Sequence, residues 1–371
     1  MPDATPFYNS VLRGMSSGFL SKGFNVLTYP RLLDATRLYR FCKHHKPDIV
    51  FEMNRVRDEI PELDPKIKHI SWIVDLQGRD LNQLQGSDIL YLFGTGWKDI
   101  HQNISNRIVD WLPPGVCQDT YFFDRKVEHC DVSFIGHIPA PWTRQELDRS
   151  IFNNKNYSLT FGELLAECKN EWSKHGGLHS IDFKTNTTII NRIISQYGDR
   201  KKIIDDTKLR YDIQVRSARV CSRQELMHNA LDISKDIKIF GTPNWSKWRA
   251  FKPYYKKFLY RCGHIRNVYQ SSRLNLHNGI GIHFRSLDCM ASGGVIVYRS
   301  TSRDNHHEGI NSHFEPFRHY IPLNDDYEKV RFYLNNPNKR YKISKEASEL
   351  VKQKHTWAKR CEKITQDLKR L

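Results

Sequence analysis

Short apolar segments alternate with helix-like stretches in the first third of the chain, and this alternation constrains the fold most strongly. The apolar segments are rich in β-branched and aromatic residues, and they comprise 25–29, 48–51, 69–74, 89–93 and 108–112. The stretches between several of them, such as 32–45, are long enough to cross over as helices. Strand, helix and strand in repetition predict a parallel sheet covered on both faces. No strand precedes 14–21, so either 7–12 is an atypical first strand or the usual first strand is missing.

A second α/β unit follows a break at Pro113, Pro114 and Gly115, which indicates an interdomain linker or, alternatively, an ordinary turn. A new strand is predicted at 131–135, and the same pattern resumes later in the chain at 237–240, 274–277 and 295–298. A chain of 371 residues exceeds the usual size of one core. We therefore predict two domains and two further segments: an N-terminal domain at 1–123, a C-terminal domain at 124–344, a helical insertion at about 144–234 and a basic helix at 345–371.

The charge balance predicts a polyanionic partner. The chain has 58 Lys and Arg against 41 Asp and Glu, a net charge of +17. Such a field attracts nucleic acid, an anionic membrane face or a phosphorylated substrate, although excess lysine also simply keeps a protein in solution. The eight cysteines form no C-x-x-C pair, which argues against a zinc site or a disulfide framework. With no apolar run of membrane-spanning length and no secretory signal in the first ten residues, we expect a cytoplasmic protein, at most peripheral at the inner membrane face.

Three predicted strand ends in the second half carry glycine: Gly136 followed by His137, then Gly241, and then Gly293 with Gly294 after Ser292. Ligands of open α/β sheets collect at the carboxyl ends of strands, where glycine allows close backbone approach. A helix N-terminus at such a place favours phosphate. The three glycine positions together suggest nucleotide binding, although glycine also ends strands for steric reasons alone.

The segment 283–294 (HFRSLDCMASGG) offers two charged candidates. Arg285 could bind diphosphate oxygens through its planar fork, and Asp288 could accept hydrogen bonds from ribose hydroxyls. The two are three residues apart, so the alternative is an ion pair within one helix. His137 and His277 also stand at strand ends and are candidates for diphosphate or sugar contacts, or are simply hydrogen-bonded in place.

The segment 244–266 combines seven Lys/Arg, seven aromatic residues and no acid. This composition suits nucleic acid through phosphate pairing and base stacking, and it equally suits a membrane interface. The third interpretation is a pair of core-packed helices with basic solvent faces.

The stretch 269–294 resembles the donor-binding signature of GT-B glycosyltransferases, and is most similar to the spore-maturation (CgeB-like) branch of the glycosyltransferase family 1-like proteins. The branch's "SK-x-LN" strand corresponds to 272–275, and its "R-x-x-E-x-x-A-x-G" helix corresponds to Arg285, Asp288, Ala291 and Gly293. The run 355–360 (HTWAKR) resembles the family's "HT-x-x-x-R" ending, and 71–75 its "W-x-x-D". Two departures stand out, since Asp288 replaces the usual glutamate and Ile280 removes any E-x7-E pair.

The resemblance implies two Rossmann-like domains facing each other across a cleft, with the nucleotide-sugar bound by the second. The residues expected to bind it are Gly136, His137, Gly241, Tyr269, Asn275, His277, Arg285, Asp288, Ser292, Gly293 and Gly294. GT-B enzymes generally stabilise the leaving diphosphate with arginine and helix dipoles. We therefore expect no metal and no cofactor besides the nucleotide-sugar substrate.

Asp75 is the predicted catalytic base, because it ends an apolar strand of the first domain where a carboxylate would face the cleft. Its alternative role is to cap the following turn, and Glu52 is the competing base. No D-x-D motif lies at a strand end; Asp205 with Asp206 and Asp325 with Asp326 are adjacent acids typical of turns.

The sequence thus predicts a glycosyltransferase that moves a sugar to an acceptor hydroxyl, on a cell-envelope glycan, a lipid-linked saccharide or modified DNA. The rival hypothesis is a non-catalytic nucleic-acid- or membrane-binding protein on a degenerate GT-B scaffold.

Overall fold

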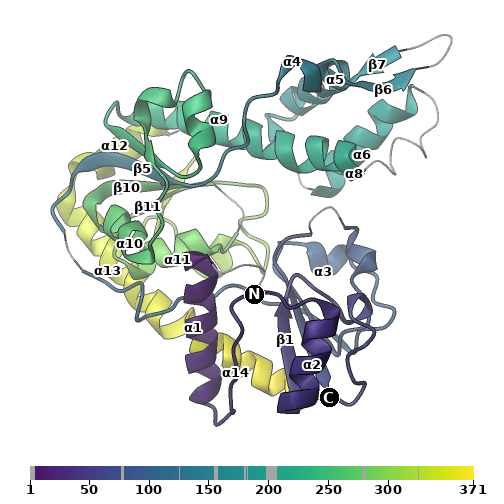
Figure 1. Ribbon diagram of the computed structural model, residues 1–371. Coiled ribbons are helices and arrows are strands. Elements are labelled where there is room, and N and C mark those ends of the chain that lie inside the picture. The colour runs from purple at the N-terminus through teal and green to yellow at the C-terminus, as the bar shows by residue number, and fades with distance from the viewer. Residues whose placement is uncertain are drawn as a thin grey trace.

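The computed structural model contains two parallel β-sheets, each with helices packed against it, and a separate lobe attached to the second (Figure 1). It describes residues 5–76, 79–124, 126–153, 158–178, 181, 183–197, 207–278, 281–324 and 326–371. The acidic pair Asp205 and Asp206, together with Ile280 and Asp325, lies outside the described residues.

The N-terminal sheet has four parallel strands in the order β1-β2-β3-β4. Its elements are α2 (Ala35–His45), β1 (Ile49–Met53), β2 (Lys68–Ile73), β3 (Ile89–Leu92), α3 (Trp97–Ile100) and β4 (Ile108–Trp111), with single 3-10 turns at Arg57–Glu59 and Leu81–Gln83. The prediction of a strand at 25–29 is wrong, because this segment is irregular and pairs with no strand among the described residues. Helix α1 (Pro6–Leu20) covers 7–12, so the alternative of an atypical strand there is wrong, and no described strand precedes β1.

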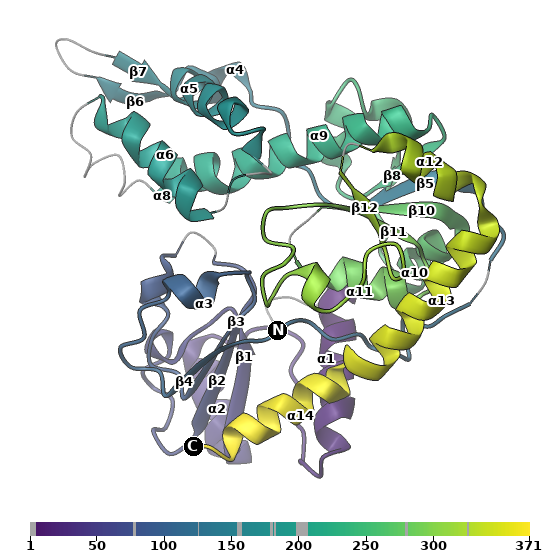
Figure 2. The ribbon, with the colours of Figure 1, turned by 180° about the vertical axis from the view of Figure 1, so that it is seen from behind.

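Helix α14 (Trp357–Leu368), at the end of the chain, crosses back and packs beside α1, as both views show (Figures 1 and 2). The two helices approach closely at Gly14, where any Cβ would collide with the Trp357 ring. The Tyr91 hydroxyl of β3 donates a hydrogen bond to Asp367 Oδ2 at 2.7 Å. The C-terminus therefore becomes part of the N-terminal domain's core.

The C-terminal sheet has six parallel strands in the order β12-β11-β10-β5-β8-β9. The strands are β5 (Cys130–Ile135), β8 (Ile237–Phe240), β9 (Tyr255–Lys257), β10 (Ser272–His277), β11 (Ile296–Arg299) and β12 (Ile321–Leu323). The central strands are largely buried, as expected for a sheet covered on both faces, although β5 and β10 also carry polar residues such as Ser133 and Asn275. The covering helices are α9 (Ala218–Ile233), α10 (Cys262–Ser271), α11 (Phe284–Ala291), α12 (Tyr327–Asn335) and α13 (Pro337–Lys354).

The lobe that projects from this domain in Figures 1 and 2 lies between β5 and α9 and has its own apolar core. It contains α4 (Arg144–Leu147), an antiparallel hairpin of β6 (Ser150–Asn153) and β7 (Ser158–Thr160), α5 (Phe161–Lys174), α6 (Phe183–Ser195) and α8 (Thr207–Arg210). A π-helical segment, Tyr211–Ser217, joins α8 to α9. The region predicted as a helical insertion thus also contains a hairpin, and its last helix, α9, packs on the main sheet.

The connection between the domains is clamped by the C-terminal segment. Arg360 Nε donates hydrogen bonds to the carbonyls of Pro113 and Pro114, both at 3.0 Å, and Val116 pairs with Thr356. The carboxyl edges of the two sheets also meet, since the loop after β11 reaches the loop after β3: Glu308 accepts a hydrogen bond from Gly96 N, and His306 lies 3.5 Å from Asp99.

In the part of the chain that the structure describes, no helix combines the length and apolar character that crossing a bilayer requires.

Candidate functional site

The predicted glycines of β5 and β8 lie side by side at the carboxyl edge of the C-terminal sheet. Gly136 N donates to Phe240 O at 2.9 Å, and Gly241 has a φ of +149°, a region that favours glycine. A Cβ on Gly241 would collide with the carbonyl of Gly136, and one on Gly136 would come within 2.6 Å of Arg285 Nη1. Glycine at 136 therefore leaves room for the Arg285 guanidinium above the strand ends, and glycine at 241 lets the ends of β5 and β8 approach closely.

Arg285 is held at this edge by the first turn of α11. His283 caps the helix, its Nδ1 accepting a hydrogen bond from Arg285 N at 3.2 Å. The guanidinium reaches across the sheet, where Nη1 donates to Ile135 O at 3.3 Å, while the buried Nε has no acceptor. Burial lowers the pKa of Arg285 below its ordinary value, with repulsion from Arg219 acting in the same direction.

Two further arginines, Arg219 and Arg223 of α9, face the same place and were not predicted. Arg223 Nε donates to His137 O at 3.3 Å, and its buried Nη1 has no acceptor. Burial and repulsion from Arg285 and Arg219 lower the pKa of Arg223 well below its ordinary value. No carboxylate of the described chain forms an ion pair with any of these three arginines. We call Arg219, Arg223 and Arg285 the arginine cluster.

Three histidines lie beside the arginine cluster, and their side chains are neutral at pH 7. Burial and the neighbouring arginines lower the pKa of His137 to about 4, and those of His277 and His283 well below the usual range. His137 Nδ1 lies 2.9 Å from Thr242 Oγ1. His277 stacks on Tyr298, but both of its ring nitrogens are buried without a hydrogen-bond partner.

The arrangement is chemically incomplete without an anion. Buried donors normally find acceptors, and buried charges are normally paired. Here Arg223, Arg285 and His277 leave buried nitrogens unsatisfied at the same carboxyl edge of one sheet. A group with several negatively charged oxygens, such as a diphosphate, matches these donors in charge and in hydrogen-bonding capacity.

Asp288 lies one turn further along α11 and forms no ion pair with Arg285, so the alternative of an intrahelical pair is wrong. Its side chain is buried, and burial alone raises the pKa of the carboxyl well above its ordinary value. The carboxyl acts electrostatically on Tyr121 and Tyr269, and it makes no hydrogen bond with another described side chain.

Tyr269 and Asn275 line a small internal cavity together with His277 and Arg285. The Asn275 amide, however, is used within the fold, since its Oδ1 accepts from Ser133 Oγ at 2.8 Å and its Nδ2 donates to Tyr269 O at 3.2 Å. Asn275 thus links two strands and α10.

The prediction that Ser292, Gly293 and Gly294 shape the pocket is wrong. A helix between two parallel strands returns in the opposite direction, so the end of α11 lies at the amino edge of the sheet, before β11. Ser292 Oγ donates to Asp288 O at 2.6 Å, and Gly293, with a φ of +82°, follows the last turn. These residues end the helix.

In the N-terminal domain, Asp75 follows β2 at the carboxyl edge, with an exposed side chain. Its backbone N–H donates to Asn54 Oδ1 at 2.9 Å. The competing base, Glu52, is buried and bonded to His69, with Nε2 to Oε2 at 3.3 Å, and to Arg55. Burial would raise the pKa of Glu52, but these hydrogen bonds outweigh it and lower the pKa, which makes Glu52 a poor base.

The basic aromatic segment 244–266 is built into the C-terminal fold. Trp245 and Phe251 are buried in its core, and Trp245 Nε1 donates to Gly136 O at 2.8 Å. Lys252, Lys256 and Lys257 are exposed beside the edge strand β9. Trp245 and Phe251 therefore pack in the core, whereas Phe258 and Tyr260 face solvent together with the lysines.

One group of described residues has the spacing of metal ligands: His306, His307 and Glu308, whose ligand atoms lie within 4.8 Å of one another. The group belongs to the contact between the domains, where Glu308 bonds to Gly96, and does not include the arginine cluster.

Comparison with solved structures assigns the architecture to the GT-B glycosyltransferase fold. AviGT4, a glycosyltransferase involved in avilamycin A biosynthesis, aligns over 97% of this chain and 88% of its own, with a TM-score of 0.51 and 11% identity. Sucrose-phosphate synthase from Thermosynechococcus elongatus (TM-score 0.47, 6% identity, 91% and 76% covered) and Anabaena HepE in complex with UDP-glucose (0.44, 9%, 91% and 82%) are also similar.

At the level of sequence, residues 221–366 match the family described as glycosyl transferase-like, so the C-terminal domain is a glycosyltransferase-like domain. The matched range contains Arg223, His277, Arg285 and Asp288. No curated protein sequence matches the chain.

Proposed function

We propose that this protein is a glycosyltransferase that binds a nucleotide-sugar at the C-terminal domain and transfers the sugar to a hydroxyl of an acceptor at the N-terminal domain. The observation that carries the proposal is the arginine cluster with its unsatisfied buried nitrogens, on a fold shared with glycosyltransferases. A diphosphate would supply the missing acceptors and the missing negative charge.

In this reaction the acceptor oxygen forms a bond to the anomeric carbon while the bond from that carbon to the diphosphate oxygen breaks. Asp75 takes the acceptor's proton, and attack from the face opposite the departing diphosphate inverts the anomeric carbon. The arginine cluster stabilises the charge that develops on the departing diphosphate, so no metal ion is needed for this step. Asp288 accepts hydrogen bonds from the ribose hydroxyls.

The net charge of +17 and the exposed lysines beside β9 favour an acidic acceptor or surface. A cell-envelope glycan, a lipid-linked saccharide and modified DNA share this property. The motifs at 272–275, 285–293 and 355–360 favour the CgeB-like branch, and the charge favours a position at the inner face of a membrane.

The proposal is tested by thermal shift with UDP, GDP, CDP, dTDP and ADP, each with magnesium and with EDTA. We expect one nucleotide to raise Tm selectively in both conditions, and Arg285→Ala to abolish the shift. Arg318→Ala is the matched control, because Arg318 is exposed and already paired with Glu315 and Glu346. If no nucleotide shifts the wild type, the protein is a non-catalytic binder on a degenerate scaffold.

A further inference from the structure

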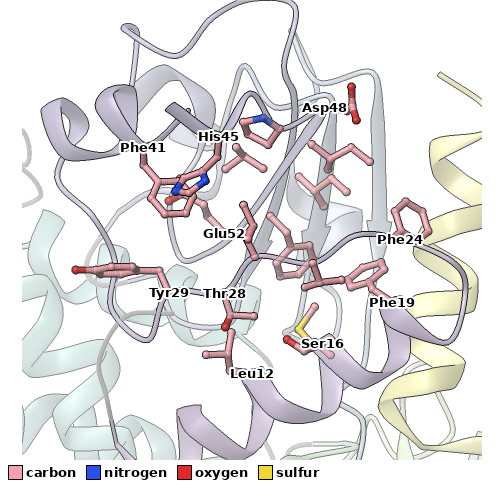
Figure 3. A pocket seen from close by; sticks show the side chains of 18 of the residues that line it. Leu12, Ser16, Phe19, Phe24, Thr28, Tyr29, Phe41, His45, Asp48 and Glu52 are labelled. Atoms are coloured by element: carbon pink, nitrogen blue, oxygen red, sulfur yellow. The ribbon is translucent and has the colours of Figure 1, made fainter. Parts of the chain in front are cut away.

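A second ligand-sized site lies in the N-terminal domain, apart from the arginine cluster. A cavity of about 390 Å³ runs between α1, α2 and the outer edge of β1 (Figure 3). Leu12, Ser16 and Thr28 lie toward one end of it, and Asp48 lies toward the other. Its volume is within the range of small-molecule sites, which is about 300–1,000 Å³.

The cavity lies where no described strand covers the outer edge of β1. Strand β1 pairs only with β2 in the described chain, so its other edge has no neighbouring strand. The segment 24–33, part of which was predicted as that strand, instead forms an irregular wall opposite this edge. Helix α1 closes the space from the third side.

The lining is mainly apolar and aromatic. Met15 and Phe19 of α1, Phe41 of α2 and Phe51 of β1 turn toward the cavity, and Leu368 of α14 contributes at one end. Burying a hydrocarbon chain against this lining would contribute about 25 cal/mol of binding free energy per Å² of apolar surface removed from water. They offer a saccharide few of the polar partners that its hydroxyl groups require.

The mouth of the cavity is exposed and apolar. Leu27 is 56% exposed and Tyr29 is 46% exposed, although both line the cavity. Leu20, at the end of α1, is 57% exposed. A monomeric protein in water seldom collects exposed apolar side chains beside an apolar cavity unless something binds there.

The rim is positively charged. Residues 31–48 contain five Lys/Arg, namely Arg31, Arg37, Arg40, Lys43 and Lys46, and two acids, Asp34 and Asp48. Asp48 and Glu52 also line the cavity, and Glu52 is paired with Arg55. All five basic side chains are exposed, and only Arg37 is ion-paired, with Asp34. Arg31 and Lys46 line the cavity itself. An apolar cavity with a basic rim is complementary to a molecule with a hydrocarbon chain and an anionic headgroup.

The position relates this site to the proposed reaction. Helix α1 contributes Leu12 to the cavity, and one turn earlier its Phe7 packs on Phe284, the first residue of α11, with ring centroids 4.7 Å apart. Strand β1, which borders the cavity, ends at the carboxyl edge of the N-terminal sheet that also carries Asp75. A chain held in the cavity would therefore be anchored in the domain assigned to the acceptor.

We infer that this cavity binds the hydrocarbon chain of an anionic amphiphile, with its phosphate-type headgroup at Arg31 and Lys46, and that the acceptor is a saccharide or other hydroxyl compound carried on such a lipid. This inference rests on the proposed function for its role as acceptor anchor, but the binding itself does not.

The test uses isothermal titration of the full-length protein with decyl phosphate below its critical micelle concentration. Inorganic phosphate and decyl maltoside serve as the headgroup-only and uncharged probes. We expect decyl phosphate to bind, decyl maltoside to bind about tenfold more weakly, and inorganic phosphate not to compete. Ser16→Trp, which fills the cavity from α1, should weaken decyl phosphate binding by about tenfold or more.

Arg31→Glu combined with Lys46→Glu, which changes the two basic residues that line the cavity, should weaken decyl phosphate binding and leave decyl maltoside binding unchanged. The matched control is Lys252→Glu with Lys256→Glu, an equal charge change on the other domain. If Ser16→Trp fails to fold, Leu27→Glu at the exposed mouth replaces it. Nucleotide thermal shifts, measured on the same samples, report the proposed function separately.

The inference is overturned if a protein that binds nucleotide does not bind decyl phosphate, or if both Ser16→Trp and Leu27→Glu leave its affinity intact. It is also overturned if the protein binds only anionic vesicles, in a manner sensitive to Arg31→Glu with Lys46→Glu but not to Ser16→Trp. That result would assign the basic rim to a membrane surface and leave the cavity without a ligand.

Discussion

At the carboxyl edge of the N-terminal sheet, the buried carboxylate of Glu52 is bonded to Arg55 and His69, and His69 is bonded in turn to Ser87 at 3.0 Å. At the corresponding edge of the C-terminal sheet, Arg219, Arg223 and Arg285 face one another with no carboxylate among the described residues to pair with them. Both sites bury charge in the same kind of fold, but only the first balances it internally.

This difference in charge balance means that the Glu52 network contributes to stability, whereas the arginine cluster contributes to ligand binding. A closed network contributes to the free energy of folding, and removing one partner leaves the others buried and unpaired. An open cluster of like charges opposes folding and gains its compensation from a ligand. The two edges should therefore respond to substitution in opposite ways.

The largest effect is expected at the exposed carboxylate beside the closed network. Asp75→Asn should reduce the turnover of sugar transfer by about 100- to 10,000-fold, because the neutral amide takes no proton from the acceptor. Nucleotide affinity, measured by titration on the same protein, should be unchanged. Near-normal turnover of Asp75→Asn would show that Asp75 is not the catalytic base.

Glu52→Gln should destabilise the protein by about 3–5 kcal/mol, because it leaves the Arg55 guanidinium buried without its counter-charge and disturbs the hydrogen bond with His69 Nε2. Urea unfolding at pH 7 measures the change in the free energy of unfolding. The control is Glu346→Gln, which removes an exposed ion pair with Arg318 and should cost no more than about 1 kcal/mol. A loss at Glu52 as small as that of the control would contradict the view of a closed network.

Arg223→Met should weaken nucleotide binding by about 10- to 100-fold, the cost of losing one charge-assisted contact to the diphosphate. The free energy of unfolding should stay the same or rise, since the change removes repulsion from Arg285 and Arg219. Titration calorimetry and urea unfolding measure the two quantities on one preparation. Arg331→Met is the control, since Arg331 is a half-buried residue outside the arginine cluster that is already paired with Glu328. If Arg223→Met destabilised the protein but left nucleotide affinity intact, the arginine cluster would be a structural network and not a ligand site.

The sequence predicted the parallel sheets, because buried strands such as 131–135 and 89–93 are nearly continuous apolar runs between helix-like stretches. It failed at 25–29, where β propensity is high but no neighbouring strand is available to pair with it. Strands β9 and β12, of three residues each, are too short to show a period, and tertiary pairing alone creates them.

The site was predicted in part. Gly136, His137, Gly241, His277 and Arg285 meet at one edge, as strand ends in a parallel sheet must. Arg219 and Arg223 were missed, although they stand four residues apart with no acid within one turn on their face, a signal that two unpaired charges share that face. Ser292, Gly293 and Gly294 were misplaced, because a motif in sequence does not show at which edge a helix ends.

Acidification should strengthen the binding of a nucleotide-sugar, whose diphosphate diester does not titrate in this range. In the free protein, burial and the arginine cluster lower the pKa of His137 to about 4, and a bound diphosphate should raise it. Between pH 7 and pH 5 the complex would then take up a proton that the free protein does not. We expect affinity to rise by up to about tenfold per unit of pKa change, and His137→Asn to remove most of the rise. An affinity that falls with pH would contradict this sign.

The smallest effect, a change of less than about twofold in nucleotide affinity, is expected from removing divalent metal with EDTA. The arginine cluster already supplies the positive charge that a metal would bring to the diphosphate, whereas the metal-like group His306, His307 and Glu308 belongs to the contact between the domains. His307→Ala separates the two roles, because it should leave nucleotide affinity intact even if it alters stability. If EDTA abolished nucleotide binding and magnesium restored it, the diphosphate would need a metal ion as well as the arginine cluster. The C-terminal edge would then differ from the N-terminal edge by a metal site and not only by its unpaired arginines.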